Sequence, residues 1–262
     1  MLCKTYTDLF TSWRIGFFYA LLKNYFEKTI AYYCITINVG CNNMTHTLII
    51  KKAIEEIEAK KFGATEQFLK IHKLVYTDNE LKIARVDTEK DDEAIVYFNV
   101  EDEKFFFAVY IDTKPNVSVR WTDTEPYHSV YFRASSDTFS LEELTELTKL
   151  TSTRGRNKGD KKRPGSETEI MWKESTIDFE PDPEVDEFKD KLTKLLDFLE
   201  QDKEGVEKLV NNAGGYIQVY SSFHNGNTLI GGHHVDKEHI KRMSQLNLEI
   251  DFDITADGNF FT

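Results

Sequence analysis

Cysteine is almost absent from this chain. The three cysteines, Cys3, Cys34 and Cys41, all lie in the first 43 residues, and the rest of the 262-residue sequence has none. A small secreted scaffold held together by disulfides is therefore excluded, as is cysteine-based catalysis from residue 44 onward. Such a sequence suits a reducing compartment, and we expect a cytoplasmic protein.

Motifs of common enzymes are also missing. The sequence has no glycine-rich dinucleotide fingerprint, no phosphate-binding loop ending in Gly-Lys-Ser/Thr, no nucleophile elbow and no His-Glu-x-x-His. Each of these motifs positions a cofactor, a phosphate, a nucleophile or a metal ion by a fixed local geometry. We therefore expect no cofactor, and we favour a protein without enzymatic activity.

Positive charge and long apolar runs are both in short supply. The chain has 33 Lys and Arg against 45 Asp and Glu, a formal net charge of −12. Affinity for nucleic-acid phosphate and anionic lipid comes mostly from Lys and Arg, so we expect neither nucleic acid nor membrane as a partner. The apolar run Ile15–Leu22 is far shorter than the ~20 residues of a membrane span. An acidic surface instead suits a basic protein partner.

Residues 1–43 differ in composition from the rest of the chain. They hold ten aromatic residues, all the cysteines and only two acids. We predict that residues 1–43 are a non-native or disordered N-terminal extension, and that Met44 is the true start of the protein. Two folded domains are then expected, over residues 44–126 and 127–262.

Residues 44–126 are predicted to form an α+β domain. Apolar residues recur near one face of a helix over Leu48–Lys61, and Gly63 follows as a natural C-cap. Four strand-like runs come next, at Leu81–Val86, Ala94–Val100, Phe105–Ile111 and Val117–Trp121. Short polar turns separate these runs, which favours an antiparallel meander packed against the helix.

Residues 127–262 alternate strand and helix patterns. Ser140 and Glu143 have capping-box spacing, and Asp182-Pro183 predicts the start of a leucine-rich helix. A strand is expected around Trp172, and Asn225–Asn227 predicts a hairpin turn. The alternation predicts an α+β fold with a mainly antiparallel sheet, helices on one face and a ferredoxin-like topology.

The last predicted strand, Leu248–Ile254, alternates apolar and acidic side chains. Its apolar side chains are expected to close the core, and Glu249, Asp251 and Asp253 point the other way. These carboxylates are spread too widely for one ion to hold all three. A solvated surface or an acidic docking face for a basic partner remain as interpretations.

The C-terminal half resembles a known family. The sequence Ser140-Leu141-Glu142-Glu143-Leu144 is followed by Arg156–Asp160, by Trp172, by a leucine-rich helix and by the ending Leu246–Asp253. This order resembles the family called domain of unknown function 4279, found mostly in bacteria, over roughly Ser129 to Gly258. The resemblance implies an α+β fold and no established activity, and it transfers no catalytic residues.

A basic loop stands out in this acidic chain. Residues 154–163 hold six cations and one acid, and glycines lie among them. Arg forks and backbone amides in such a loop bind phosphate or carboxylate groups. We predict that Arg154, Arg156 and Lys158 form an anion- or partner-binding site, with Trp172 closing one side; a mobile solvated loop and a core Trp are the alternatives.

The histidines His224, His233, His234 and His239 gather in one stretch and are weak candidates for a metal site. Their spacing matches no metal-binding motif, so we predict no metal.

Two functional hypotheses result. The first is a non-enzymatic acidic protein-binding module, with immunity to a basic toxin as one concrete form. The second is a small-molecule anion-binding module or enzyme that uses the basic loop 154–163 and Trp172.

Overall fold

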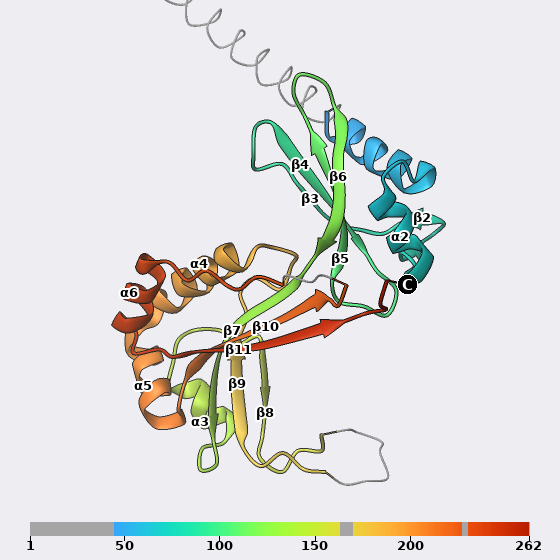
Figure 1. The fold of residues 1–262 in the computed structure, drawn as a ribbon. Helices are drawn as coiled ribbons and strands as arrows, with labels where there is room; N and C mark the ends of the chain where they lie inside the picture. The colour runs from blue at the N-terminus through green and yellow to red at the C-terminus, as the bar shows by residue number, and fades with distance from the viewer. Residues whose placement is uncertain (1–44, 163–169, 227–229, 262) are drawn as a thin grey trace, which may run out of the picture.

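The structure, a computed structural model, describes residues 45–162, 170–226 and 230–261. The predicted extension 1–43, Met44 and Arg163 lie outside the described residues. The described chain forms a four-stranded sheet, a five-stranded sheet and a small two-stranded one. Figure 1 shows the two larger sheets one above the other, joined where the last strand of the four-stranded sheet leads directly into the first strand of the five-stranded sheet.

The N-terminal half is an antiparallel meander covered by helices, as predicted. Strands β3, β4, β5 and β6 follow one another across the sheet, each antiparallel to the next. Short turns enforce this order, because they leave no length for a crossover. The elements are a helix over residues 45–59, α2 (Gly63–Ile71), β1 (Tyr76–Thr77), β2 (Glu80–Leu81), β3 (Ile83–Asp87), β4 (Glu93–Asn99), β5 (Phe106–Asp112) and β6 (Ser118–Glu125).

The helix over residues 45–59 faces the sheet with one stripe of buried residues. Ile49, Ala53 and Ile57 pack on the sheet, whereas Leu48 is 40% exposed. Residues four apart lie on one helix face, and the small Ala53 lets the helix approach the sheet closely. Gly63 does not cap this helix but begins α2.

The C-terminal half has the expected ferredoxin-like strand order. Strands β10, β7, β9 and β8 are neighbours in that order, and each pair is antiparallel. A fifth strand, β11, is added parallel to β10 at the edge. The elements are β7 (Tyr127–Ser136), α3 (Leu141–Glu146), β8 (Arg154–Arg156), β9 (Ser175–Phe179), α4 (Phe188–Leu199), a 3₁₀ turn (Glu200–Asp202), α5 (Lys203–Ala213), β10 (Tyr216–His224), α6 (Lys237–Gln245) and β11 (Ile250–Asp257).

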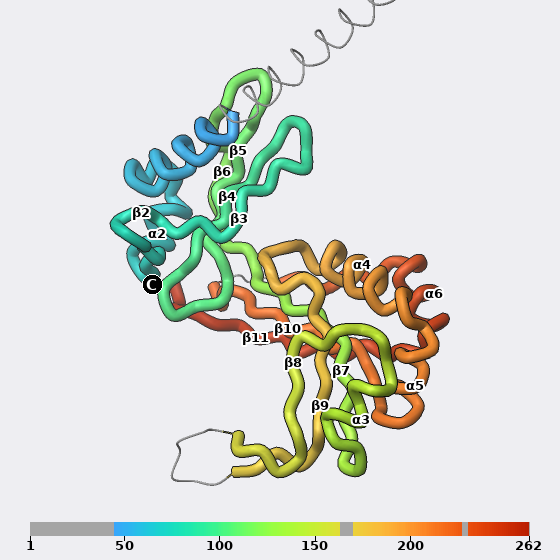
Figure 2. The backbone as a smooth tube through the Cα atoms, turned by 180° about the vertical axis from the view of Figure 1, so that it is seen from behind, coloured from blue at the N-terminus to red at the C-terminus, as the bar shows by residue number. Residues whose placement is uncertain are grey.

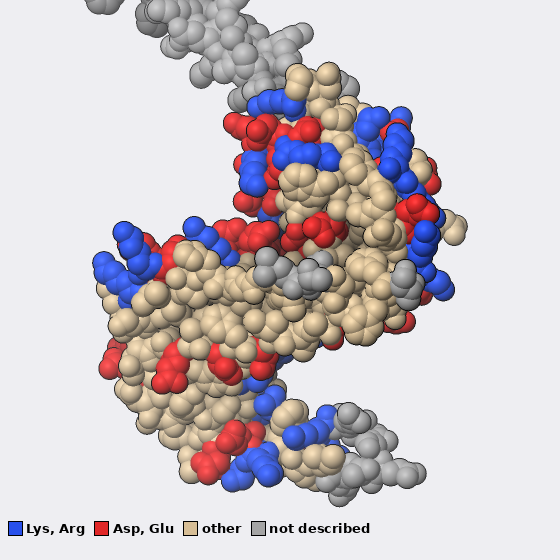
Figure 3. Space-filling view, viewed as in Figure 1, with Lys and Arg blue, Asp and Glu red and all other residues tan. Residues whose placement is uncertain are grey.

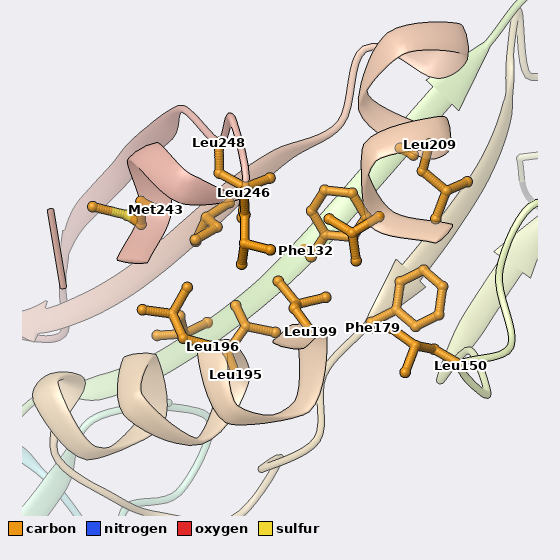
Figure 4. Close-up of a cluster of buried hydrophobic side chains, with 14 of the residues drawn as sticks. Phe132, Leu150, Phe179, Leu195, Leu196, Leu199, Leu209, Met243, Leu246 and Leu248 are labelled. Carbon is orange, nitrogen blue, oxygen red and sulfur yellow. The ribbon is translucent and has the colours of Figure 1, made fainter. Parts of the chain in front are cut away.

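The helices of this half all pack on one face of the five-stranded sheet. Figure 4 shows Leu195, Leu196 and Leu199 of α4 meeting Phe132 of β7, with residues of α5 and α6 completing the cluster. The capping box predicted for α3 is present, with Ser140 and Glu143 bonded to each other's backbone N–H. No helix of the described residues lies on the other face of the sheet (Figure 1).

Two strands of this sheet lie where the sequence predicted something else. The basic loop predicted over residues 154–163 begins with β8, which pairs with β9 at the sheet edge. The strand expected around Trp172 is instead β9, a few residues later. Residues 157–162 and 170–172 extend side by side beyond β8 and β9 (Figure 2). They form a second ladder, in which the Gly159 N–H donates to Trp172 O.

The leucine-rich helix begins later than Asp182-Pro183 predicted. Its N-cap is Glu187, and the residues before it are extended toward the N-terminal half. Tertiary contacts explain the delay: Lys191 Nζ donates to the backbone oxygens of Asp182 and Glu184, and Arg85 donates to Asp186. The segment is therefore used as a bridge between the halves.

The predictions at the end of the chain need two corrections. Strand β10 has β7 on one side and β11 on the other, so the hairpin partner expected after Asn225–Asn227 has no place beside it; residues 227–229 lie outside the described part of the chain. The predicted closing strand Leu248–Ile254 is the edge strand β11, and Ile254 is 47% exposed.

A single residue, Pro126, separates β6 of the first sheet from β7 of the second. Around this point Tyr97 and Phe106 of the first sheet pack with Tyr127 and Val185 of the second half. The two halves therefore meet through a small apolar cluster as well as through the chain itself.

Candidate functional site

The helix-free face of the five-stranded sheet is polar because of strict alternation along its strands. On β7, Val130, Phe132 and Ala134 are buried under the helices. Their neighbours Tyr131 and Arg133 must then point to the opposite face, since successive side chains in a strand alternate. The same alternation in β9, β8 and β10 places polar and charged side chains on this face.

A cavity of about 620 Å³ lies on this face. Its lining includes four cations, Lys104, Arg133, Arg154 and Arg156, but one carboxylate, Asp178. A volume of this size suits a small molecule. Figure 3 shows the molecule hollowed beside the extension of β8 and β9, with Lys and Arg side chains along the wall of the hollow.

Gly155 explains how β8 presents two arginines to one side. A Cβ at Gly155 would lie 2.4 Å from the Leu141 side chain of α3. Any side chain at this position would require Leu141 to shift, so glycine favours this close packing of α3 on the strand. Arg154 and Arg156, on either side of Gly155, consequently face the cavity.

Arg133 is neutralised by a buried partner. Its Nε and Nη2 each donate to an Asp178 carboxylate oxygen at 2.8 Å, and the Asp178 side chain is 5% exposed. The hydrogen bonds to Asp178 raise the pKa of Arg133. Arg154 approaches Asp178 and Glu180 more loosely, at 3.5 and 3.4 Å. The Tyr131 ring lies near both guanidiniums, 4.9 Å from that of Arg133 and 5.2 Å from that of Arg154.

Arg156 has no such partner. Its guanidinium lies 3.6 Å from the centre of the Trp172 ring, and Lys162 Nζ lies 4.5 Å from the same ring. Within the described residues it forms no ion pair, and its buried Nε has no hydrogen-bond acceptor. Burial, and then the nearby Arg133, lower the pKa of Arg156. An aromatic ring orients a guanidinium without neutralising it, so this charge is available to a ligand.

Lys104 completes the cavity from the N-terminal half. It belongs to the connection between β4 and β5, and its Nζ lies 4.2 Å from the Tyr220 ring centre and 5.7 Å from that of Tyr127. The hydroxyl of Tyr220 is within 3.2 Å of Thr255 Oγ1 on β11.

The structure brings together three of the four residues predicted for the anion site. Arg154 and Arg156 line the cavity, and Trp172 lies against Arg156. Lys158 points elsewhere, because its Nζ donates to the backbone oxygen of Asp137. The backbone N–H of Lys158 donates to Ser175 Oγ.

Sequence reasoning did not find Arg133, Asp178, Tyr131 or Lys104. Alternation within residues 129–134 already placed Tyr131 and Arg133 away from the core. The missing information was that residues 154–156 form a strand and that β9 begins at Ser175, because Arg133, Asp178 and Arg154 meet only through the pairing of β7, β9 and β8.

The acidic residues Glu249, Asp251 and Asp253 are all exposed. Asp251 and Asp253 pair in register with Gln218 and Tyr220 of β10. Glu249 precedes β11 and lines a separate cavity between α5 and α6.

The four histidines named as weak metal candidates do not converge. His224 Nε2 lies 2.9 Å from His72 Nε2, and His233 Nε2 lies 2.9 Å from Ser221 Oγ. His239 contacts Asp236 and Thr193, and His234 is exposed. Within residues 45–162, 170–226 and 230–261, no three His, Cys, Asp or Glu side chains are grouped so that they could hold a metal ion.

No helix in the described part of the chain is both long enough and apolar enough to cross a lipid bilayer.

The fold and cavity define an α+β protein with a ferredoxin-like strand order, one added parallel strand and a basic open face. The family model described as Domain of unknown function (DUF4279) matches residues 125–257, and the chain belongs to this family. The resemblance seen in the sequence is thereby confirmed. No curated protein and no solved structure matches the chain.

Proposed function

We propose that this protein is a binding module for a small anionic molecule, held in the cavity on the open face of the five-stranded sheet. The observation that carries the proposal is Arg156, a half-buried guanidinium that rests on Trp172 and has no carboxylate partner among the described residues. In a chain of net charge −12, a cavity lined by four cations and one acid is a local reversal of charge. Phosphate and carboxylate groups match the fork of an Arg side chain.

The test is calorimetric titration of the full chain with inorganic phosphate and with phosphonate compounds at low ionic strength. We expect Arg156→Gln to weaken binding by about tenfold or more, since a charge-assisted hydrogen bond contributes about 1.5–3 kcal/mol. Lys158→Gln is the matched control, because Lys158 is a cation of the same basic stretch outside the cavity. Saturable binding that is equally strong in both variants, or no binding at millimolar ligand, contradicts the proposal.

A second candidate function is the binding of a basic protein through the acidic edge strand. Asp251 and Asp253 are exposed on β11 and form no ion pair among the described residues. Carboxylates of this kind steer and bind cationic surfaces. We expect a basic partner, if captured by the full chain from its native cell, to be released by moderate salt and to be lost with Asp251→Asn/Asp253→Asn. Retention of the partner by that variant would rule out this surface.

A further inference from the structure

Lys104 and Arg156 lie at opposite ends of the cavity. Tyr220, whose ring lies beneath Lys104, pairs in register with Ser129 of β7. Arg156 pairs with Thr176 of β9, and Thr176 pairs with Ser135 of β7. Ser129 and Ser135 are separated by ~20 Å along the strand. Tyr220 and Arg156 also stand on different strands on either side of β7 and β9. One phosphate or carboxylate group is too small to contact both cations.

Lys104 is, like Arg156, a cation held by aromatic rings and not by a carboxylate. It lies over Tyr220 and Tyr127, and it forms no ion pair with any described residue. Asp257 is already bonded to the hydroxyls of Ser222 and Thr255 at 2.6 Å; these bonds lower its pKa, with a smaller contribution from the charge of Lys104. The charge of Lys104 is therefore also available to a ligand.

We propose that Lys104 forms a second anion subsite, so that the ligand of this cavity is an elongated small molecule with an oxyanion group at each end. One phosphate or carboxylate group contacts Arg156 and Arg154, and the other contacts Lys104. The inference rests on the proposed function, because it requires an anion at Arg156. It adds that the N-terminal half, which lies outside the family match, takes part in ligand selection.

Three probes separate the two subsites in calorimetric titrations of the full chain at low ionic strength. Octane-1,8-diyl bisphosphonate has two distant anions, octylphosphonate has the same chain with one anion, and methylenebisphosphonate has two adjacent anions. We expect the long bisphosphonate to bind about fivefold more tightly than octylphosphonate, which exceeds the roughly twofold advantage of having two identical ends. Methylenebisphosphonate is expected to lack this advantage.

Substitutions of Lys104 test whether this residue causes the tighter binding of the long bisphosphonate. Lys104→Gln should weaken binding of the long bisphosphonate more than binding of octylphosphonate and so remove the preference, and Lys104→Glu should reverse the preference. Lys104 is exposed, so neither change removes a buried contact. Lys73→Gln is the matched control, because Lys73 is an exposed lysine of the same half that lines a different cavity. Decanedioate compared with decanoate repeats the test with carboxylates and shows which oxyanion the ends prefer.

The outcomes distinguish this inference from the proposed function. If octylphosphonate binds in an Arg156-dependent way but the long bisphosphonate binds no more tightly, or if Lys104→Gln weakens both probes equally, the second subsite is wrong and the anion site stands. If none of the phosphonates binds at millimolar concentration, both ideas are wrong.

Discussion

The cationic side chains of the cavity are positioned in two ways. Arg133 is fixed by a bidentate pair with Asp178, and Arg156 and Lys104 are fixed by aromatic rings. A carboxylate both positions and neutralises a cation, whereas a ring positions it and leaves its charge. Substitution of Arg133 would strand a buried carboxylate and reduce stability. Arg156 and Lys104 are consequently the residues at which binding can be changed separately from folding.

Glu125, the last residue of β6, is a carboxyl group whose ionisation is opposed by burial. Burial raises the pKa of Glu125 to about 7, and the nearby Glu187 and Asp123 act in the same direction against a hydrogen bond from Tyr110. The folded-state pKa lies above the ordinary value of 4.5, so the native state favours protonated Glu125. This contribution to stability is present at low pH and is lost as the pH rises through about 7.

We therefore expect Glu125→Gln, which resembles the protonated acid, to raise the free energy of unfolding at pH 8 by on the order of 2 kcal/mol. Urea unfolding at several pH values measures the effect, and the gain should shrink toward pH 4.5. Glu142→Gln on the exposed side of α3 is the control. A gain at pH 8 that persists unchanged at low pH would show that ionisation is not its cause.

Among the helices and strands, those with a local sequence signal were predictable, whereas a strand that forms only by pairing was not. The capping box at Ser140 and the meander were correctly predicted, because each depends on residues close together in the chain. Strand β8 was predicted as a loop, since three residues, Arg154–Arg156, become a strand only by pairing with β9. The same limit explains the site: Arg154, Arg156 and Trp172 were predicted from composition, but the pairing of β8 with β9, which brings them near β7, was not.

The C-terminus of α5 offers a prediction at the element scale. Gly214 follows the helix in the left-handed conformation, with φ 58° and ψ 52°, and a Cβ there would meet no atom within 4 Å. Gly214→Ala should therefore cost about 1 kcal/mol of unfolding free energy from the backbone alone. Gly63→Ala, at the open first position of α2, is the matched control and should be neutral or slightly stabilising. Equal effects in chemical denaturation would contradict this explanation.

At the scale of the whole molecule, a buried imidazole pair joins the two halves. His224 at the end of β10 lies 2.9 Å from His72 at the end of α2, and Phe68, Phe105 and Phe261 surround the pair. His72 Nε2 also accepts from the backbone N–H of Asn259, which belongs to the C-terminal segment. The helix-covered N-terminal half, β10 and the chain end are thus held at one point.

Acid should weaken this junction. Burial lowers the pKa of both His72 and His224, and the backbone N–H groups of Asn259 and Gly226 already donate to their ring nitrogens. Asp123 opposes the shift of His224 slightly. Because the folded-state pKa lies below the ordinary 6.5, the unfolded state takes up protons first, and stability falls as the pH drops below 6.5.

His224→Gln tests this prediction, since an amide donates to His72 and does not titrate. Between pH 6.5 and 5, the variant should lose stability less steeply than the parent chain, by about 1 kcal/mol per pH unit. Thermal and urea unfolding measure both slopes, and His234→Gln at an exposed position should keep the parent slope. Parallel slopes in all three proteins would exclude the pair as the acid-sensitive element.

Pro126 is the single residue between β6 and β7, and its position bears on which ligands the cavity can hold. A proline ring locks one backbone dihedral at this junction, and the apolar cluster that includes Tyr97, Phe106, Tyr127 and Val185 packs around it. Lys104 belongs to the half of the chain before this junction and Arg156 to the half after it, and both line the cavity. If the proposed two-anion ligand binds here, the separation of Lys104 and Arg156 would select ligands by their length as well as by their charge.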